Sequence, residues 1–424
     1  MLYKPYRILS LDGGGTFCLA QARALQELFG PDMPGRQVLS QFQLAAGTSG
    51  GSFVIAALVA DLTPGQIVRL FQSEQNRQRF FCKLPWYERL LSVLTMGDIG
   101  CRFSMESKRD FMASVVGTNG PRKMSELADE RGMPELLIVG YDYQFDRAKL
   151  LRSRSDSGAA NFPRNDGHIS LLDAINLSTH APLNWFGGLA SAAGSNSPGF
   201  WDGALTGFNN PVQLAASEAI ANGVPRDAIG VLSLGSGNCM LLPWDADCDP
   251  SFKVKAPRPC LRKDLRKVAR AIIAEPPDAD SYLAHLSLSA QVPRQAGQAC
   301  ESPIIRCSPL IHPRREGQHW APPKGFASPE EFGRLVDMDI AATADEDVRL
   351  IELLCDNWIS GASQNQAVRR AGGYFSLDAN GRWNEQRCCE IGFARFADAK
   401  AAWASMSREP AVTTQGRECA SSES

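Results

Sequence analysis

The sequence has no apolar run long enough to span a membrane. Its longest apolar stretches, such as FVIAALVA at 53–60, are much shorter than the ~20 residues that a membrane-spanning helix requires. The N-terminal sequence MLYKPYRILSLDGGG has too short an apolar segment and no small-residue cleavage pattern, so we expect no signal peptide. We therefore predict a cytoplasmic protein with no transmembrane segment, whose contact with membranes is peripheral.

An excess of positive charge is also absent. Lysine and arginine total 44 against 46 aspartate and glutamate residues, which gives a formal net charge of −2. Because nucleic acids bind to strongly basic surfaces, we expect no nucleic-acid partner. The 12 cysteines form no CxxC pair, so the sequence predicts neither a zinc nor a redox motif, and we expect reduced, structural thiols.

The composition and the pattern of the first half predict a globular α/β protein. Of the 424 residues, 44% are hydrophobic and 21% are charged, which is typical of a chain that buries a sizeable core. Buried strands and helices alternate, and this alternation favours a mostly parallel sheet. We expect strands over 7–11, 41–46, 135–143, 148–153, 199–204 and 230–237, and helices over 19–29, 52–62, 170–177 and 211–222 and from residue 64 onward.

The second half carries helical patterns but no motif with evident chemistry. Helices are expected over 264–274 and 346–360, and the polar stretch 413–424 is expected to fray. We predict a catalytic core over 1–245 and a largely helical extension over 246–405 that packs on the core or caps it. Residues 406–424 are expected to form a flexible tail.

A turn that suits a nucleophilic serine lies between the second expected strand and the next helix. Gly47-Thr48-Ser49-Gly50-Gly51 fits the pattern G-x-S-x-G, which requires this context. A side chain at Gly47 or Gly51 would clash with the crowded backbone as Ser49 is forced outward, and Gly50 belongs to the same supporting turn. The helix start behind Ser49 would favour developing negative charge. The alternative is a glycine-rich connection in which Ser49 only caps the helix.

A second glycine cluster, Asp12-Gly13-Gly14-Gly15, closes the first expected strand. The N–H groups of Gly13, Gly14 and Gly15 can converge on an anion, because no side chains obstruct them. One use is an oxyanion hole for ester hydrolysis. The other is phosphate binding, because LDGGGT also resembles the turn of sugar kinases and actin-like ATPases. The helical pattern after Thr16 argues against that fold, which continues into a β-hairpin.

The base that would activate Ser49 has two candidate types. Histidine is the usual base, but none of the five histidines lies in a telling context, although a Ser-Asp-His order remains open. They are His168, His180, His285, His312 and His319. Asp202 ends an expected strand beside Gly203, which lets the backbone approach closely. A free aspartate has a pKa near ~3.9, so Asp202 would need burial to become a base.

Five motifs occur in a telling order: DGGG at 12–15, GTSGG at 47–51, STHAP at 178–182, WDGA with NNP at 201–211, and LSLGSG at 232–237. Over roughly residues 6–240 the chain resembles the patatin-like phospholipase family. The resemblance implies a three-layer α/β/α sandwich, a Ser49–Asp202 dyad without histidine, an oxyanion hole at Gly13–Gly15, and no metal or cofactor. Ser49 would form an acyl-enzyme that water hydrolyses, releasing a fatty acid from a phospholipid or another lipid ester.

The chain departs from that family after the DGGG loop. Members usually have a basic residue and then glycine there, whereas in this chain Phe17 and Cys18 follow Thr16. This departure makes the preference for a particular lipid headgroup uncertain, whereas the predicted hydrolysis depends on the glycine N–H groups, which are still present. An acyltransferase with the same acyl-enzyme is an open alternative, because only the acceptor differs, and the sequence does not reveal whether an activating partner or small molecule is required.

Overall fold

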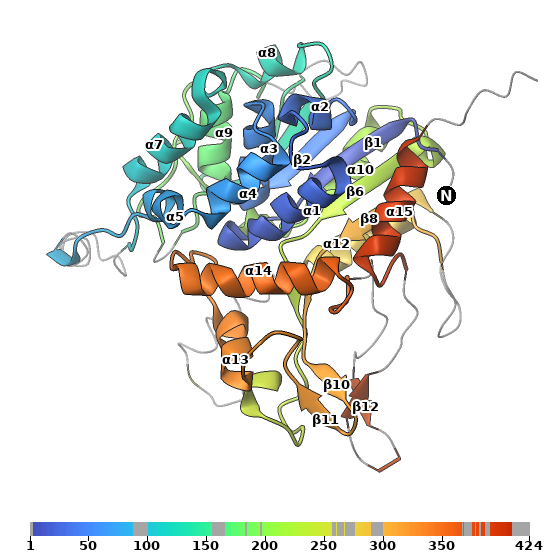
Figure 1. Ribbon diagram of the computed structural model, residues 1–424. Coiled ribbons are helices and arrows are strands. Elements are labelled where there is room, and N and C mark those ends of the chain that lie inside the picture. Colours follow the sequence, from blue (N-terminus) through green and yellow to red (C-terminus); the bar gives the residue numbers. More distant parts are fainter. Residues whose placement is uncertain are drawn as a thin grey trace, which may run out of the picture.

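The computed structural model has a sheet at its centre, helices on both sides of the sheet, and a second group of elements below it (Figure 1). The described residues are 3–87, 101–154, 166–182, 185–195, 197–256, 260, 267, 276–289, 300–366, 368, 375–377, 379–380, 383–385 and 391–408. The helix predicted over 264–274 lies outside them except for Lys267, and so does the tail predicted to fray.

Seven strands form the central sheet, in the order β4-β3-β2-β1-β6-β8, with β5 paired to β3. Their bounds are β1 Tyr6–Leu11, β2 Leu44–Thr48, β3 Glu135–Asp142, β4 Arg147–Arg152, β5 Phe200–Asp202, β6 Ile229–Leu234 and β8 Ile304–Cys307. Strands β1, β2, β3, β6 and β8 run parallel, whereas β4 and β5 run antiparallel to β3. Parallel strands that are covered on both faces are expected to be mostly apolar. Every residue of β2 and β6 is buried, and only Thr48 and Ser233 among them are polar.

The helices cover both faces of the sheet. Their bounds are α1 Leu19–Phe29, α2 Gly35–Leu39, α3 Gly50–Val59, α4 Pro64–Gln72, α5 Glu74–Phe80, α7 Met105–Val116, α8 Met124–Ala128, α9 Leu171–Ser178, α10 Val212–Ala221, α12 Pro276–Leu288, α13 Pro329–Asp337, α14 Asp345–Ile359 and α15 Phe396–Ser407. Among these described helices none is long and apolar enough to cross a membrane.

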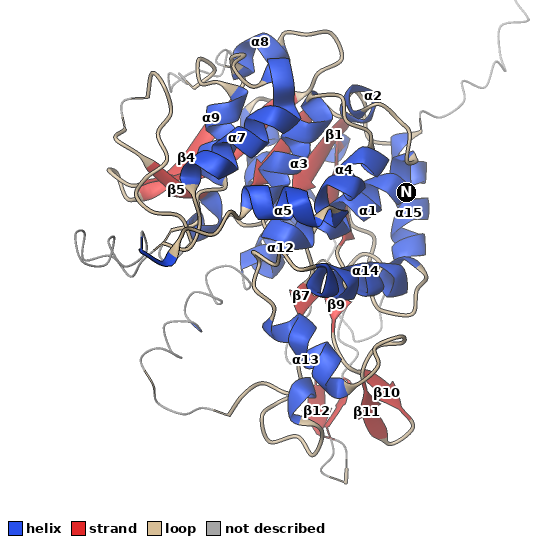
Figure 2. Ribbon diagram, turned by 60° about the vertical axis from the view of Figure 1, so that its left-hand side comes forward, coloured by secondary structure: helices blue, strands red, loops and turns tan. Residues whose placement is uncertain are grey.

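Alternate residues of β1 show the layering. Leu9 and Leu11 belong to the core shared with α1 and α3, whereas Ile8 belongs to the core shared with α10 and α12. This alternation follows from the two-residue period of a strand, which sends successive side chains to opposite faces. Figure 2 shows α1, α3 and α4 in front of the strands. The predicted fold class, an α/β/α sandwich with a mostly parallel sheet and a helical C-terminal region, is confirmed.

The C-terminal region packs closely against the core. It supplies β8 to the edge of the central sheet, α14 lies on α1, and α15 lies against β8 (Figure 1). It also contains two strand pairs that sequence analysis did not anticipate: β10 Arg314–Glu316 with β11 His319–Ala321, and β12 Phe375–Leu377 with β13 Trp383–Glu385. A short strand of this region, β9 Leu310–Ile311, pairs in parallel with β7 Asn238–Cys239, which lies before residue 246. The domain boundary at residue 245 stays a prediction.

A buried ion pair joins β8 to the loop after β1. The Arg306 guanidinium donates to both carboxylate oxygens of Asp12, at 2.8 and 2.5 Å, and to Ser233 Oγ at 2.8 Å. Both charged side chains are almost fully buried. Since Ser233 lies opposite Arg306 in the register of β6 and β8, the sheet itself aims the guanidinium at Asp12. The bidentate contact fixes the start of the glycine loop.

Removal of one partner of this pair should destabilise the protein strongly. Arg306→Met would leave the Asp12 carboxylate buried and unpaired, and such a loss typically costs about 3–5 kcal/mol. We expect the free energy of unfolding, measured by urea denaturation, to fall by about that amount. The double variant Asp12→Asn with Arg306→Met should be less destabilised than Arg306→Met alone, because it buries no lone charge. Equal stability of Arg306→Met and the wild type would contradict the prediction.

Candidate active site

Ser49 lies in a sharp turn where β2 ends and α3 begins. Its φ of 50° and ψ of −124° are unusual for a residue with a side chain, and its backbone N–H donates to Ser178 Oγ at 2.9 Å. The predicted supporting glycines allow the close approach. A Cβ on Gly47 would come within 2.8 Å of Ile55 Cδ1, and one on Gly51 within 2.4 Å of the Leu11 carbonyl oxygen. Such strained turns typically occur at functional sites.

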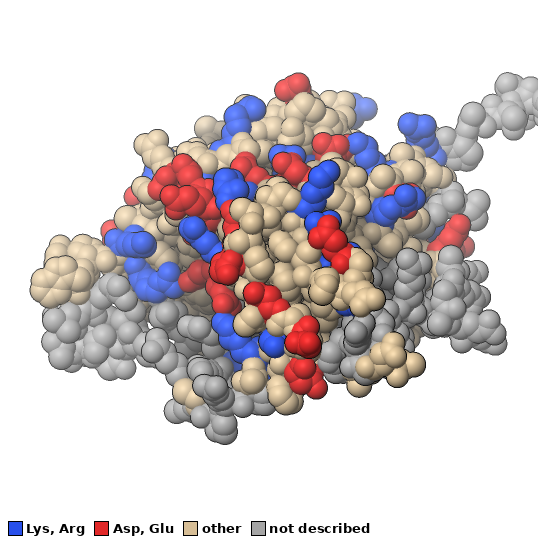
Figure 3. Space-filling model, turned by 60° about the horizontal axis from the view of Figure 1, so that its bottom comes forward, with Lys and Arg blue, Asp and Glu red and all other residues tan. Residues whose placement is uncertain are grey.

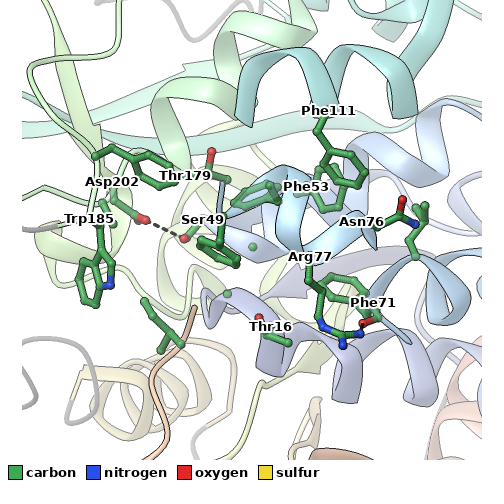
Figure 4. Close-up of a pocket in the computed structure, with 18 residues that line it drawn as sticks. Thr16, Ser49, Phe53, Phe71, Asn76, Arg77, Phe111, Thr179, Trp185 and Asp202 are labelled. Atoms are coloured by element: carbon green, nitrogen blue, oxygen red, sulfur yellow. Dashed lines mark hydrogen bonds between the residues drawn. The ribbon is translucent and has the colours of Figure 1, made fainter. Parts of the chain in front are cut away.

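Asp202 reaches Ser49 because two strands share one edge of β3. Strand β2 pairs with the first part of that edge, which ends where Thr48 lies opposite Val139. The next residue of β3, Gly140, pairs with Asp202 of β5. The opposite edge of β3 is occupied by β4. Asp202 therefore ends next to the turn after β2, where Ser49 Oγ donates to Asp202 Oδ2 at 2.7 Å (Figure 4).

The backbone around Asp202 is packed as tightly as the turn around Ser49. A Cβ on Gly203 would lie 2.3 Å from the Val139 carbonyl oxygen, so only glycine fits there. The second carboxylate oxygen, Asp202 Oδ1, accepts the Ala204 N–H at 2.9 Å. Each oxygen of the carboxylate thus has a donor, which fixes its orientation toward Ser49.

Burial makes Asp202 a stronger base than a free aspartate. It raises the pKa of Asp202 to about 6, against the opposing effects of the Ala204 N–H, the Ser49 hydroxyl and the positive charge of Lys108. Lys108 is itself fully buried, and burial lowers its pKa to about 7. Its ammonium donates to Asn176 O at 3.0 Å and lies 4.5 Å from the centre of the Phe186 ring.

The hydrogen-bond acceptor of the Ser49 hydroxyl is an aspartate and not a histidine. The Ser49 hydroxyl donates to Asp202, and His180 meets Asp202 only through its backbone carbonyl, which accepts the Asp202 N–H at 2.9 Å. The imidazole of His180 is buried 3.5 Å from the Lys108 ammonium, and burial together with that charge lowers its pKa to about 3. His168 contacts Gly194 O, and His285 contacts Ser302 Oγ.

The glycine loop lies directly against Ser49. A Cβ on Gly13 would come within 3.0 Å of Ser49 Cβ, and a Cβ on Gly50 within 3.1 Å of the Gly15 nitrogen. The Gly13 N–H already donates to Asn209 O at 2.9 Å. The N–H groups of Gly14 and Gly15 donate to none of the described acceptors. The N–H groups of Gly14 and Gly15 could therefore receive an anion, whereas that of Gly13 is engaged, and the oxyanion hole at Gly13–Gly15 stays a prediction.

Thr16, which directly follows the glycine loop, binds the C-terminal region. Its N–H donates to Ile340 O at 2.8 Å and its hydroxyl to Ala342 O at 2.9 Å. Gly15, with a φ of +54°, faces the same carbonyl, because a Cβ there would lie 2.4 Å from Ile340 O. The segment around Ile340 thus supports the glycine loop from outside.

An apolar pocket of about 680 Å³, including the part open to solvent, begins at Ser49. Aromatic rings dominate its wall, and Figure 4 shows Phe53, Phe71 and Phe111 beyond Ser49 on the side away from Asp202. The lining residues are Gly15, Thr16, Ser49, Gly50, Phe53, Leu70, Phe71, Asn76, Arg77, Phe80, Phe81, Phe111, Thr179, Ala181, Trp185, Phe186, Asp202 and Ile340. Such a wall suits an acyl chain and offers few groups to a polar substrate.

Sequence reasoning missed three residues that hold this site. Lys108 and Ser178 are buried behind Ser49 and Asp202, and Arg306 holds Asp12 from a distant part of the chain. Ser178 lies within the STHAP motif, but that motif alone did not indicate that Ser178 contacts the turn at Ser49. Lys108 and Arg306 lie in no recognisable motif. Among the described residues no cluster of histidine, cysteine, aspartate or glutamate could hold a metal ion.

Comparison with known proteins agrees with this geometry. Residues 9–216 match the family model described as patatin-like phospholipase. The cGAMP-activated phospholipase of Pseudomonas aeruginosa (strain BWHPSA011 / Pa011) is 36% identical over 78 residues, which are 18% of this chain and 22% of that protein. The chain thus matches about a fifth of the length of this curated relative.

Two solved structures match more of the chain at low identity. VipD from Legionella pneumophila matches with a TM-score of 0.33 and 10% identity, covering 84% of this chain and 67% of VipD. Human GIVD cytosolic phospholipase A2 in complex with methyl gamma-linolenyl fluorophosphonate matches with a TM-score of 0.34 and 15% identity, covering 83% and 56%. Residues 9–216, just under half of the chain, thus belong to the patatin-like phospholipase family.

Proposed function

We propose that this protein is a lipid acyl hydrolase of the phospholipase A or lysophospholipase type, with Ser49 as nucleophile and Asp202 as base. The observation that carries the proposal is the 2.7 Å hydrogen bond from Ser49 Oγ to Asp202 Oδ2 at the end of an apolar pocket. Family membership supports the reaction class. The pocket wall supports a fatty acyl chain as the group that is bound.

The proposed reaction has two halves. In the first, Ser49 Oγ attacks the ester carbonyl while Asp202 accepts the proton of the Ser49 hydroxyl. The oxyanion that forms accepts hydrogen bonds from the N–H groups of Gly14 and Gly15. Collapse of this intermediate breaks the ester bond, and the protonated Asp202 returns its proton to the leaving alcohol. In the second, Asp202 takes a proton from water, which attacks the acyl-enzyme. The bond between Ser49 Oγ and the acyl carbon then breaks, Asp202 returns the proton to Ser49 Oγ, and the fatty acid leaves.

An acyltransferase would use the same first half, with an alcohol in place of water in the second. The two are separated by product analysis in the presence of an acceptor alcohol. The sugar-kinase-like alternative is disfavoured by the elements after the DGGG loop. A short 3-10 turn, Gly15–Cys18, leads directly into α1, where that fold would have a β-hairpin.

Whether a small molecule must bind before the protein becomes active is a separate question. The curated relative is by its printed name activated by cGAMP, and this chain matches a small part of it. We propose to assay the protein with and without cGAMP before any variant is judged. Peripheral contact with a membrane surface is the expected setting, because the substrates are lipids.

Both proposed catalytic residues should be required for turnover. We expect Ser49→Ala and Asp202→Asn each to lower kcat/KM for a short-chain p-nitrophenyl ester by at least about 1,000-fold, because residues that act as a unit lose most of the rate together. Labelling by a fluorophosphonate probe should disappear in Ser49→Ala. His319→Ala is the matched control and should retain activity. Retained turnover in Asp202→Asn, or its loss in His319→Ala, would contradict the dyad.

The activity should depend on pH through Asp202. Since the base must be deprotonated and its pKa is raised to about 6, kcat/KM should fall as the pH drops through about 6. Lys108 is mostly charged at pH 6, because its pKa is about 7, and its charge lowers the pKa of Asp202. Lys108→Met should therefore move the acidic limb to higher pH. Lys255→Met, which changes an exposed lysine, should leave the limb in place.

The pocket should set the preference for acyl chains. Leu70 lies in α4 beside Phe71 and lines the pocket. Leu70→Trp would fill part of the space, so we expect kcat/KM for palmitoyl esters to fall by about 10-fold relative to butyryl esters. Leu283→Trp, at an exposed position, provides the control. An equal loss for both chain lengths would mean that the acyl chain does not lie along Leu70.

A further inference from the structure

One wall of the pocket continues to the protein surface as a short ribbon, which we define as residues 81–87 and 101–105. Its two sides are joined by hydrogen bonds from Leu84 N to Arg102 O at 2.9 Å and from Ser104 N to Cys82 O at 2.8 Å. Lys83 and Phe103 form an isolated antiparallel bridge between them. The ribbon follows α5 directly and extends to the left of it in Figure 1.

The inner side of the ribbon belongs to the pocket. Phe81 lines the pocket together with Phe186, and their ring centres are 6.4 Å apart. Phe103 is 1% exposed and packs between them, at 5.4 Å from Phe81 and 5.9 Å from Phe186. Any object that contacts the outer side of the ribbon is thus one layer of side chains away from the pocket.

The outer side of the ribbon carries Trp86, which is the most exposed large apolar side chain among the described residues, together with two further exposed ones. Trp86 is 75% exposed and Tyr87 57% exposed, their rings meet edge to face at 6.2 Å, and Met105 is 39% exposed on the other side of the ribbon. Exposed tryptophan and tyrosine are costly in water, whereas they are favoured at the boundary between lipid headgroups and acyl chains.

Positive charge flanks these rings. Arg79 and Lys83 are exposed, and neither forms an ion pair with a described carboxylate. Arg102 lies on the ribbon and pairs with Asp339 at 2.7 Å, while Glu106 and Asp110 are exposed on α7 nearby. Figure 3 shows lysine and arginine side chains next to an uncharged surface at the left of the molecule. Arg79 lies over the Phe111 ring at 5.2 Å, which leaves its charge without a described counter-ion. Exposed cations beside exposed aromatic rings complement an anionic lipid surface.

We propose that the ribbon is a docking surface for an anionic phospholipid bilayer, with Trp86 and Tyr87 inserted at the headgroup level and Lys83 against the lipid phosphates. Docking in this orientation would bring the pocket mouth to the substrate. The inference rests on the proposed function for its biological purpose, but the docking itself is a separate physical property that does not require turnover.

Binding is tested with the full chain carrying Ser49→Ala, which removes hydrolysis during the measurement. Co-sedimentation with vesicles of phosphatidylcholine and phosphatidylglycerol should show binding that weakens with added NaCl. Addition of Trp86→Ser and Tyr87→Ser should reduce the binding constant by about 10-fold or more, and Lys83→Glu should reduce it on anionic vesicles alone. Trp244→Ser, which removes another exposed tryptophan, is the matched control and should bind like Ser49→Ala.

Turnover provides a second readout. The double variant Trp86→Ser with Tyr87→Ser, made with Ser49 intact, should hydrolyse a soluble p-nitrophenyl ester at the wild-type rate. It should hydrolyse phospholipid in vesicles at least about 10-fold more slowly than the wild type. If neither the wild type nor the variant hydrolysed any substrate, the proposed function would be wrong, but the binding test would still be valid. The proposed docking surface would be wrong if the two aromatic substitutions left binding unchanged or if the protein bound no vesicles at all. A protein partner would then be the alternative occupant of the ribbon.

Discussion

The shared edge of β3 is the constraint on which the site depends. Because β2 ends at Thr48 and β5 begins its pairing at Gly140, two residues far apart in sequence meet at one point of the sheet. The meeting leaves little room for adjustment, since a Cβ on Gly203 would overlap the Val139 carbonyl. The hydrogen bond between Ser49 and Asp202 is thus a consequence of strand register, and the strained turn at Ser49 is held by the same packing.

Buried charge is the second physical theme of the molecule. Asp12 and Arg306 form a bidentate ion pair, which fixes the loop that carries Gly14 and Gly15. Burial raises the pKa of both aspartates, but Asp202 has no guanidinium in direct contact and its carboxylate accepts the Ser49 hydroxyl, which suits it to act as a base. The difference between the two aspartates comes entirely from what surrounds them. A bidentate guanidinium makes one a structural anchor, and its absence leaves the other reactive.

Local patterns predicted the elements whose signals are local. The apolar runs at β1, β3 and β6 and the glycine turns after β1 and β2 were evident from the sequence, and the structure has these elements within a few residues. Strand β2 begins at Leu44 rather than residue 41, because Gln41 and Phe42 still form turn hydrogen bonds to Val38 and Leu39.

The remainder depended on contacts between distant residues. Strand β8 has only four residues, too few for a clear period, and its place in the sheet is decided by pairing with β6. The predicted Gly13 donor is occupied by Asn209, a contact between residues far apart in the chain that no local pattern encodes. Lys108 is likewise invisible to motif analysis, because its α7 looks like an amphipathic surface helix until α9 covers it.

The missing basic residue after the glycine loop changes what the pocket can recognise. Thr16 is engaged with two carbonyls of the C-terminal region, and the one arginine that lines the pocket, Arg77, is also committed. Its guanidinium donates to Phe71 O, Gln72 O and Thr343 O and pairs with Asp345. The pocket therefore offers no uncommitted cation among its lining residues for a headgroup phosphate. Discrimination among phospholipids would then arise from how a surface presents the acyl ester, and the charged groups that sense headgroups would lie outside the pocket, on the face that meets the bilayer.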